Sequence, residues 1–202
     1  MEIYIVRHGK TLWNKEKRLQ GSADIELAQE GRDVAIQTGD ALKDVHFDKI
    51  YSSPLSRAYE TAKLIRGDRD IEIICDDRLR ELNFGENEGR RVTEIQEEED
   101  NPFNKFFTKP EEYYPLQGGE SLEEICERAK SFIKEVIEPQ AKDLQRIMIV
   151  GHGAVNKAIM CYVLDHGIDE YWSGGLQRNC GTIIVRLDDN GYGLIEENTT
   201  FY

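Results

Sequence analysis

The sequence predicts an α/β protein built as a three-layer α/β/α sandwich, with a mostly parallel central sheet and a C-terminal antiparallel hairpin. Short β-branched runs alternate with amphipathic helical patterns along most of the chain, which is typical of parallel sheets covered on both faces. An Asp-Asn-Gly turn near the end joins two further strand-like runs. The 202 residues, 39% of them hydrophobic, are enough for one substantial core.

The N-terminal part supplies the first strands and helices. Apolar residues at three- and four-residue steps over residues 27–45 predict an amphipathic helix. Ser53 and Pro54 are expected as N-cap and first residue of a second helix that runs to about Ile65, because proline lacks the N–H that a helix start leaves unbonded. Three short runs of β-branched and aromatic residues are expected as buried strands, at residues 3–6, 49–52 and 71–75.

The alternation resumes in the C-terminal part. A Ser-x-x-Glu capping box at residues 121–124 predicts the start of a long amphipathic helix. Residues 147–150 form the fourth strand-like run, and residues 154–164 are expected to form the helix after it. Runs at 182–187 and 192–195 flank Asn-Gly, which accommodates the positive φ of a tight hairpin turn.

The stretch between these two parts lacks regular periodicity. It contains three of the five prolines and a cluster of aromatic residues, namely Phe103, Phe106, Phe107, Tyr113 and Tyr114. These side chains would either contact a substrate with an apolar or ring portion or form the core of the segment itself. We expect one domain over residues 1–202, with an insertion at about residues 89–120 that covers the site.

Composition and charge exclude several classes of protein. With 26 basic against 39 acidic side chains the formal net charge is −13, whereas a nucleic-acid binder needs a cationic surface to displace counterions. No run approaches the roughly 18 apolar residues of a membrane-spanning helix, and the start of the chain shows no signal-peptide pattern. The four cysteines lack the spacing of a metal or disulfide motif, so we expect free thiols and a cytoplasmic protein.

Most of the negative charge lies in one segment. Residues 81–127 contain 4 basic and 14 acidic side chains, a net charge of −10, while the parts before and after it are almost neutral. Repulsion by this segment would oppose any long-range attraction of an anionic ligand. Binding of such a ligand would therefore depend on a local cationic pocket.

Two of the four histidines directly follow predicted strands. His8 follows the first strand and His152 the fourth, each next to a glycine, which lets the backbone approach a ligand closely. Ligands of parallel sheets bind at the carboxyl ends of the strands, so the two imidazoles are expected to meet there. A single histidine in such a place is commonly structural, as we expect for His46 and His166, but the matched pair favours a functional site.

Arginines accompany these two histidines. Arg7 precedes His8, and Arg57 is expected on the first turn of the helix after the second strand. Guanidinium groups bind phosphate oxygens in pairs and stay charged. Neither histidine has a neighbouring metal-ligand residue at the required spacing, which disfavours a metal site. The set predicts a pocket for a phosphoryl-sized anion, with one imidazole available as a nucleophile.

These residues belong to motifs that recur in a fixed order. The motifs are RHGKTLWN at 7–14 continued by R-x-Q-G-x-x-D at 18–24, SSPLSRA-x-x-TA at 52–62, LRE-x-x-x-G-x-x-EG at 79–89, GGES at 118–121 with Arg128, and GHG at 151–153. The ordered set resembles the histidine phosphatase superfamily, in its phosphoglycerate mutase-like branch. It spans residues 1 to about 155 and is far more specific than any one of its parts.

The resemblance implies a phosphoryl transfer in two steps that uses no metal and no other cofactor. His8 is expected to attack phosphorus and become phosphohistidine, from which water releases phosphate. Arg7, Arg57 and His152 would surround the transferring group and stabilise the charge on its oxygens. Glu81 would protonate the leaving alkoxide and then help to activate water.

The resemblance also implies a set of substrate contacts, namely Lys10, Asn14, Gln20, Gly21 and Gly153. Lys10 stands where the family usually has glutamate or glutamine, and a cation there is expected to favour a more anionic substrate. For Asn14 the alternative is a helix cap. The expected partner is a small phosphorylated metabolite, in whose site a phosphate or sulfate ion would also fit. No nucleic acid or membrane is expected, and the sequence indicates no oligomeric state.

Three functions are open to such a family member. Hydrolysis of phosphomonoesters is favoured, because mutases of the family generally have longer insertions and a C-terminal tail over the site, whereas this sequence reaches Tyr202 soon after its hairpin. Phosphoglycerate mutase-type transfer is the second. A catalytically idle binding module is the third, and the presence of all five implied catalytic residues argues against it.

Overall fold

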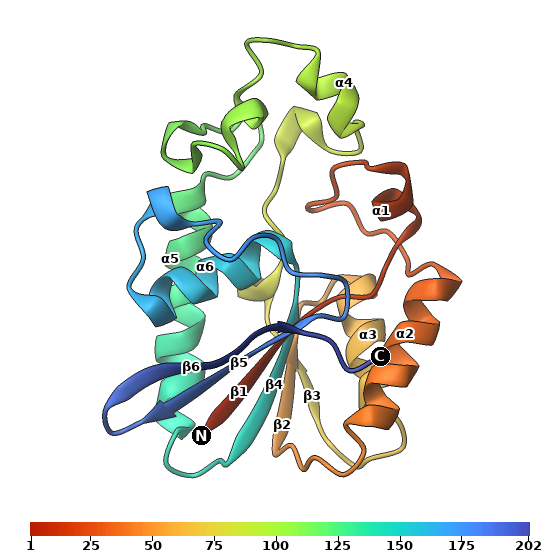
Figure 1. The fold of residues 1–202 in the computed structure, drawn as a ribbon, viewed down its shortest axis with the longest axis vertical. Helices are drawn as coiled ribbons and strands as arrows, with labels where there is room; N and C mark the ends of the chain where they lie inside the picture. The colour runs from red at the N-terminus through yellow and green to blue at the C-terminus, as the bar shows by residue number, and fades with distance from the viewer.

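The computed structural model describes residues 1–202, and its centre is a six-stranded sheet with the order β3-β2-β4-β1-β5-β6 (Figure 1). In that order the strands are Ile73–Cys75, Lys49–Ser52, Arg146–Gly151, Glu2–Arg7, Thr182–Asp188 and Gly191–Thr199. The first four strands are parallel, β5 pairs antiparallel with β1, and β6 pairs antiparallel with β5. The predicted mostly parallel sheet with a C-terminal hairpin is confirmed.

Helices cover both faces of the sheet (Figure 1). The α2 (Gln29–Ala41) and α3 (Ser56–Arg66) helices lie on one face, and α5 (Leu122–Phe132) and α6 (Gly153–Leu164) lie on the other. Side chains alternate along β1, so that Ile3 and Ile5 join the core under α5 and α6, whereas Val6 joins the core under α2 and α3. This arrangement confirms the three-layer sandwich. None of the helices combines the length and the apolar composition that a membrane crossing requires.

The predicted start of the second helix was wrong. The α3 helix begins at Ser56 with Leu55 as its N-cap, not at Ser53 and Pro54. The reason lies in the sheet, because the Ser53 N–H extends the ladder by donating to the Val150 carbonyl at 3.0 Å. Ser53 Oγ accepts from the Leu55 N–H at 3.3 Å, so the hydroxyl closes a turn before the helix.

Other local predictions held with adjusted boundaries. The capping box at the start of α5 is present, with Ser121 and Glu124 each accepting from the backbone N–H of the other. The chain continues beyond α5 through a wider helical turn at Ile133–Ile137 and a short 3₁₀ turn at Glu138–Gln140. Gly191, in the hairpin turn, has φ of 98°, as the Asn-Gly pattern predicts.

Residues 89–120, which we call the lid segment, lie beyond the carboxyl ends of the strands (Figure 1). The segment contains α4 (Val92–Gln96) and two 3₁₀ turns, Pro102–Lys105 and Pro110–Glu112. Phe103 and Phe106 are 3% and 1% exposed, and their rings stack with centroids 5.1 Å apart. These two rings therefore form the core of the segment, whereas Phe107 is exposed, and Phe106 and Phe107 also line the cavity described below.

Candidate active site

The parallel pairing of β1 with β4 brings His8 and His152 together. Arg7 and Gly151 are register partners in the ladder, and the His8 N–H donates to the Gly151 carbonyl at 3.0 Å. The residues that follow the two strands are consequently neighbours, with imidazole centroids 5.1 Å apart. Both side chains are buried.

The surroundings of His8 define its protonation state. Its Nδ1 lies 2.7 Å from the Gly9 carbonyl oxygen, which only accepts hydrogen bonds, so the hydrogen is on Nδ1 and the lone pair is on Nε2. Burial, together with the charges of Arg57 and Arg7, holds the pKa of His8 well below its usual value. A neutral imidazole with a free Nε2 lone pair is the form that acts as a nucleophile.

His152 is held in the opposite tautomer. Arg57 Nε donates to His152 Nδ1 at 3.1 Å, so the imidazole hydrogen is on Nε2, which donates to Ser53 Oγ at 2.8 Å. Burial lowers the pKa of His152 well below its usual value, and Arg57 and His8 add to the effect. The ring is therefore a fixed neutral donor.

The two buried histidines make stability depend on pH. An unfolded histidine titrates near pH 6.5, whereas both folded pKa values lie lower, so below about pH 6.5 the unfolded chain binds more protons. We expect the free energy of unfolding to fall as pH decreases from 6.5 to 5, by up to about 1.4 kcal/mol per pH unit for each histidine. Urea unfolding across this range measures the slope.

His152→Gln should remove about half of this slope. Equal slopes in the wild type and His152→Gln would contradict the assignment.

Arg57 is fully buried despite its place on the first turn of α3. Its Nη1 and Nη2 donate to the carbonyl oxygens of Ala23 and Gly21, both at 2.7 Å. Burial lowers the pKa of Arg57 to about 10, so the group remains charged at neutral pH, and the charge of Glu81 favours this form.

Gly21 lies behind the cavity described below and is not part of its lining. A Cβ there would lie 2.1 Å from the Leu82 carbonyl oxygen, so only glycine fits. The Gly21 carbonyl accepts a hydrogen bond from Arg57 at 2.7 Å, and the substrate contact expected from the sequence stays a prediction.

Arg7 ends β1 and faces the candidate site. Its Nη1 donates to the Gln177 carbonyl at 2.6 Å, while its buried Nε has no acceptor. Burial lowers the pKa of Arg7, and the charge of Glu81 partly offsets that shift. An unmatched buried donor on a cation is a place where an anionic ligand gains a charge-assisted hydrogen bond.

The carboxylate of Glu81 lies at the N-terminus of α6. Its Oε1 accepts from the N–H groups of Leu82, Ala154 and Val155 at 3.0 to 3.1 Å. Its Oε2 accepts only from the Ala154 N–H, at 3.0 Å. Oε2 therefore keeps a free lone pair, and a Cβ on Gly153 would lie 3.5 Å from it and 3.7 Å from Arg7 Nε. Gly153 thus lies between the Glu81 carboxylate and the Arg7 guanidinium, and because it has no side chain it leaves the space between them open.

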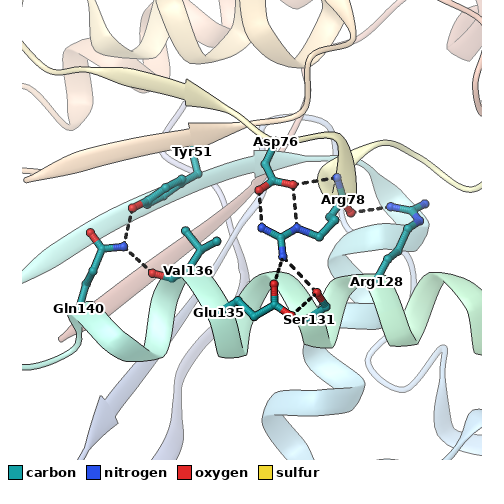
Figure 2. Close-up of polar contacts among 8 residues, drawn as sticks. All are labelled: Tyr51, Asp76, Arg78, Arg128, Ser131, Glu135, Val136 and Gln140. Carbon is teal, nitrogen blue, oxygen red and sulfur yellow. Dashed lines mark hydrogen bonds and ion pairs between the residues drawn. The ribbon is translucent and has the colours of Figure 1, made fainter.

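A polar network fixes the loop that leads from β3 to Glu81 (Figure 2). The Arg78 guanidinium binds Asp76 at 2.7 and 3.0 Å and reaches Ser131 and Glu135 beyond the sheet, at 3.0 and 2.8 Å. Arg128 then donates to the Arg78 carbonyl at 2.5 Å. Arg128 also pairs with Glu120 at 2.6 and 2.9 Å, which ties the end of the lid segment to the same loop.

These groups border a cavity of about 330 Å³. Seven of the ten residues expected from the sequence line it: Arg7, His8, Lys10, Asn14, Gln20, Glu81 and Gly153. Arg57 and His152 lie behind His8, where they contact it or one another. No group of three or more His, Cys, Asp or Glu side chains has the geometry of a metal site.

Two of the residues expected to contact the substrate, Asn14 and Gln20, also form hydrogen bonds within the protein. Asn14 Oδ1 accepts from the Thr11 N–H at 3.0 Å in a capping box of α1 (Leu12–Glu16), so the helix-cap alternative is confirmed. Gln20 Oε1 accepts from Thr11 Oγ1 at 2.5 Å, while its buried Nε2 has no acceptor. The Gln20 amide therefore offers a donor at the cavity wall.

Lys10 is already paired. Its Nζ lies 2.7 Å from Glu30 Oε1, and Lys15 binds the other oxygen of the same carboxylate. The Lys10 side chain is 41% exposed, so the pair is solvated at the rim of the cavity.

Other lining residues were missed from the sequence: Lys17, Arg18, Trp172, Leu176 and Asn179 are examples. Asn179 donates to the His8 carbonyl at 3.0 Å, and Trp172 Nε1 donates to the Phe106 carbonyl of the lid segment at 2.6 Å. The residues after α6 carry no periodicity or recognisable motif. The one available signal was their place just before a strand that pairs with β1.

The fold and the site together define an α/β protein with a cavity at the carboxyl edge of its sheet whose lining includes Arg7, Lys10, Lys17 and Arg18. Residues 3–200 match the family described as "Histidine phosphatase superfamily (branch 1)". Phosphoserine phosphatase 1 of Hydrogenobacter thermophilus is 30% identical over 200 residues, which cover 99% of this chain and 93% of that protein. "Probable phosphoglycerate mutase GpmB" of Salmonella choleraesuis is 32% identical, over 93% of this chain and 85% of that protein.

Solved structures agree with this match. Bacillus stearothermophilus YhfR has a TM-score of 0.90 and 33% identity, with 98% of this chain and 97% of that chain covered. Phosphoserine phosphatase of Entamoeba histolytica in complex with 3-phosphoglyceric acid has a TM-score of 0.85 and 28% identity, with the same coverage. The chain belongs to the histidine phosphatase superfamily, branch 1. This membership confirms the predicted class of enzyme, a phosphoric monoester hydrolase.

Proposed function

We propose that the protein is a metal-independent phosphatase that hydrolyses small phosphomonoesters through a phosphohistidine on His8. The observation that carries the proposal is the state of His8, a neutral imidazole whose Nε2 lone pair is free beside the buried, unmatched Nε of Arg7. Glu81, with one uncommitted oxygen, lines the same cavity. Nucleophile, cation and acid thus face one space.

In the first step, His8 Nε2 attacks phosphorus and the bond from phosphorus to the ester oxygen breaks. In the complex with the ester, Glu81 carries a proton on Oε2 and transfers it to the departing oxygen, which leaves as an alcohol. Arg7 and Arg57 stabilise the negative charge on the transferring phosphoryl oxygens, and the His152 ring beside His8 stays fixed by its two hydrogen bonds.

In the second step, water attacks the phosphohistidine from the side that the alcohol has vacated. The ionised Glu81 accepts a proton from this water as the bond from nitrogen to phosphorus breaks. Inorganic phosphate leaves, and His8 regains its free lone pair. Glu81 serves as acid and then as base, so the cycle returns every group to its starting form.

The proposal is tested by hydrolysis of p-nitrophenyl phosphate with and without excess EDTA. We expect the same kcat in both solutions, because the charge of the transferring group is balanced by guanidinium groups. Loss of activity in EDTA, with recovery on addition of a divalent metal, would refute the metal-independent mechanism.

A mutase reaction is the second candidate, because the Salmonella choleraesuis relative carries that name. Isomerisation of 3-phosphoglycerate in the presence of 2,3-bisphosphoglycerate, compared with release of inorganic phosphate, separates the two. We expect phosphate release to dominate. No hydrolysis of any ester and no isomerisation would instead favour the idle binding module.

A further inference from the structure

Three cations outside the proposed catalytic set line the cavity: Lys10, Lys17 and Arg18. Lys10 is paired with Glu30 at 2.7 Å, and Arg18 Nε is paired with Glu16 at 2.5 Å. Lys17 Nζ has no carboxylate within 4 Å and no hydrogen-bond acceptor. Lys17 is therefore the one cation of this group without a carboxylate partner.

The remaining polar groups of the cavity do not balance it either. Glu81 is the only carboxylate in the lining, and its oxygens already accept four contacts from backbone N–H groups. The unmatched donors Arg7 Nε and Gln20 Nε2 are buried in the part of the wall that includes His8, where the phosphoryl group must lie for attack. The phosphoryl oxygens of the substrate would accept hydrogen bonds from these two donors. No acceptor is assigned to Lys17 in this way.

Backbone hydrogen bonds and a left-handed conformation hold Lys17 in place at the end of α1. Lys17 is the C-cap of α1, with φ of 54° and ψ of 41°, a left-handed conformation that usually selects glycine or asparagine. Its N–H donates to the Asn14 carbonyl at 3.3 Å, and its carbonyl accepts from the Val92 N–H of the lid segment at 2.9 Å. The residue therefore lies at the contact between the loop of α1 and the lid segment.

We propose that Lys17 binds a second anionic group on the substrate, so that the preferred esters carry a carboxylate or a second phosphate on the alcohol portion. The inference rests on the proposed phosphatase function and specifies its substrate class. It also moves the role that the sequence suggested for Lys10 to a different lysine, because Lys10 already has a carboxylate partner in Glu30. An ammonium group matches either anion as a point charge.

The test compares matched esters that differ only in the second anion. One pair is 3-phosphoglycerate and glycerol 3-phosphate, which differ by a carboxylate, and the other is fructose 1,6-bisphosphate and fructose 6-phosphate, which differ by a phosphate. We expect the wild type to favour the member with the second anionic group in at least one pair, and the preferred pair identifies which anion is recognised. Lys17→Met should lower kcat/KM for that member about tenfold and change kcat/KM for its counterpart with a single phosphate less than about twofold.

Two variants serve as controls. Lys17→Arg keeps the charge and should retain most of the preference, whereas Lys15→Met removes a lysine of the same helix that does not line the cavity and should change nothing. Equal losses for both members of a pair, or no preference in the wild type, would overturn the proposal. Failure of the phosphatase function is distinguishable, because it would abolish turnover of all four esters and of p-nitrophenyl phosphate.

Discussion

Replacement of His8 by alanine is expected to reduce kcat for p-nitrophenyl phosphate by about 10⁴-fold or more. The variant lacks the only imidazole in the cavity lining, whose neutral form has a free Nε2 lone pair. Arg7 still lines the cavity and Arg57 still contributes its positive charge from behind it, so phosphate binding should persist while turnover stops. Steady-state release of nitrophenol measures the loss, and isothermal titration with inorganic phosphate measures the retained binding.

The same variant tests the covalent intermediate. Rapid acid-free quenching of wild-type protein with radioactive substrate should trap phosphate on the chain, at less than one per chain, in a form labile in acid and stable in base, and His8→Ala should trap none. Added imidazole should restore part of the activity, because the deleted ring leaves a space of its own shape. His46→Ala, on the exposed histidine, is the matched control. Retention of more than a few per cent of wild-type kcat in His8→Ala would exclude His8 as the nucleophile.

The central part of the site could be predicted from the sequence because strand geometry determines it. Parallel strands present their carboxyl ends at one edge, so two glycine-flanked histidines after β1 and β4 had to lie close together. The observed register of Arg7 with Gly151 adds the detail that the two imidazoles are side by side. Neither residue needed information from distant loops.

Residues whose positions depend on tertiary contacts were not predictable in this way. Serine is a residue type that commonly caps helices. In Ser53, however, the N–H donates to the neighbouring strand and the hydroxyl oxygen accepts from His152. Trp172 and Asn179 reach the cavity through irregular chain, which local periodicity does not describe. The pairing of Lys10 with Glu30 likewise joins residues from separate elements.

The acidic character of the chain has little effect inside the cavity. Residues 81–127 carry a net charge of −10, yet Glu81 is the only one of their carboxylates in the lining. Glu88 accepts from the backbone N–H groups of Gly21, Ser22 and Phe84, and the others are exposed or paired, as Glu98 is with Arg90 and Glu112 with Lys105. The charge of the cavity lining is therefore set by the local cations and not by the net charge of the chain. Glu81 is the one acidic side chain in this lining, and its presence there requires a chemical reason.

That reason predicts a dependence on the leaving group for Glu81→Gln. An alkoxide leaves only with a proton, whereas p-nitrophenolate leaves without one, so loss of the acid should matter for the first alone. We expect kcat/KM to fall about 10² to 10³-fold for glycerol 3-phosphate and less than about tenfold for p-nitrophenyl phosphate. Because kcat/KM reports steps up to phosphohistidine formation, slower hydrolysis of the intermediate does not obscure the comparison.

The Glu81→Gln substitution removes the transferable proton while it preserves the hydrogen bonds that hold the N-terminus of α6. Glutamine keeps an oxygen that can accept from Leu82, Ala154 and Val155, so the N-terminus of α6 should stay in place. Glu86→Gln, on an exposed residue of the same loop, controls for the loss of one charge. With p-nitrophenyl phosphate the Glu81 variant should release a burst of about one nitrophenol per chain before a slow steady state, because water then lacks its base. Equal losses for both esters, without a burst, would mean that Glu81 holds the helix rather than transferring the proton.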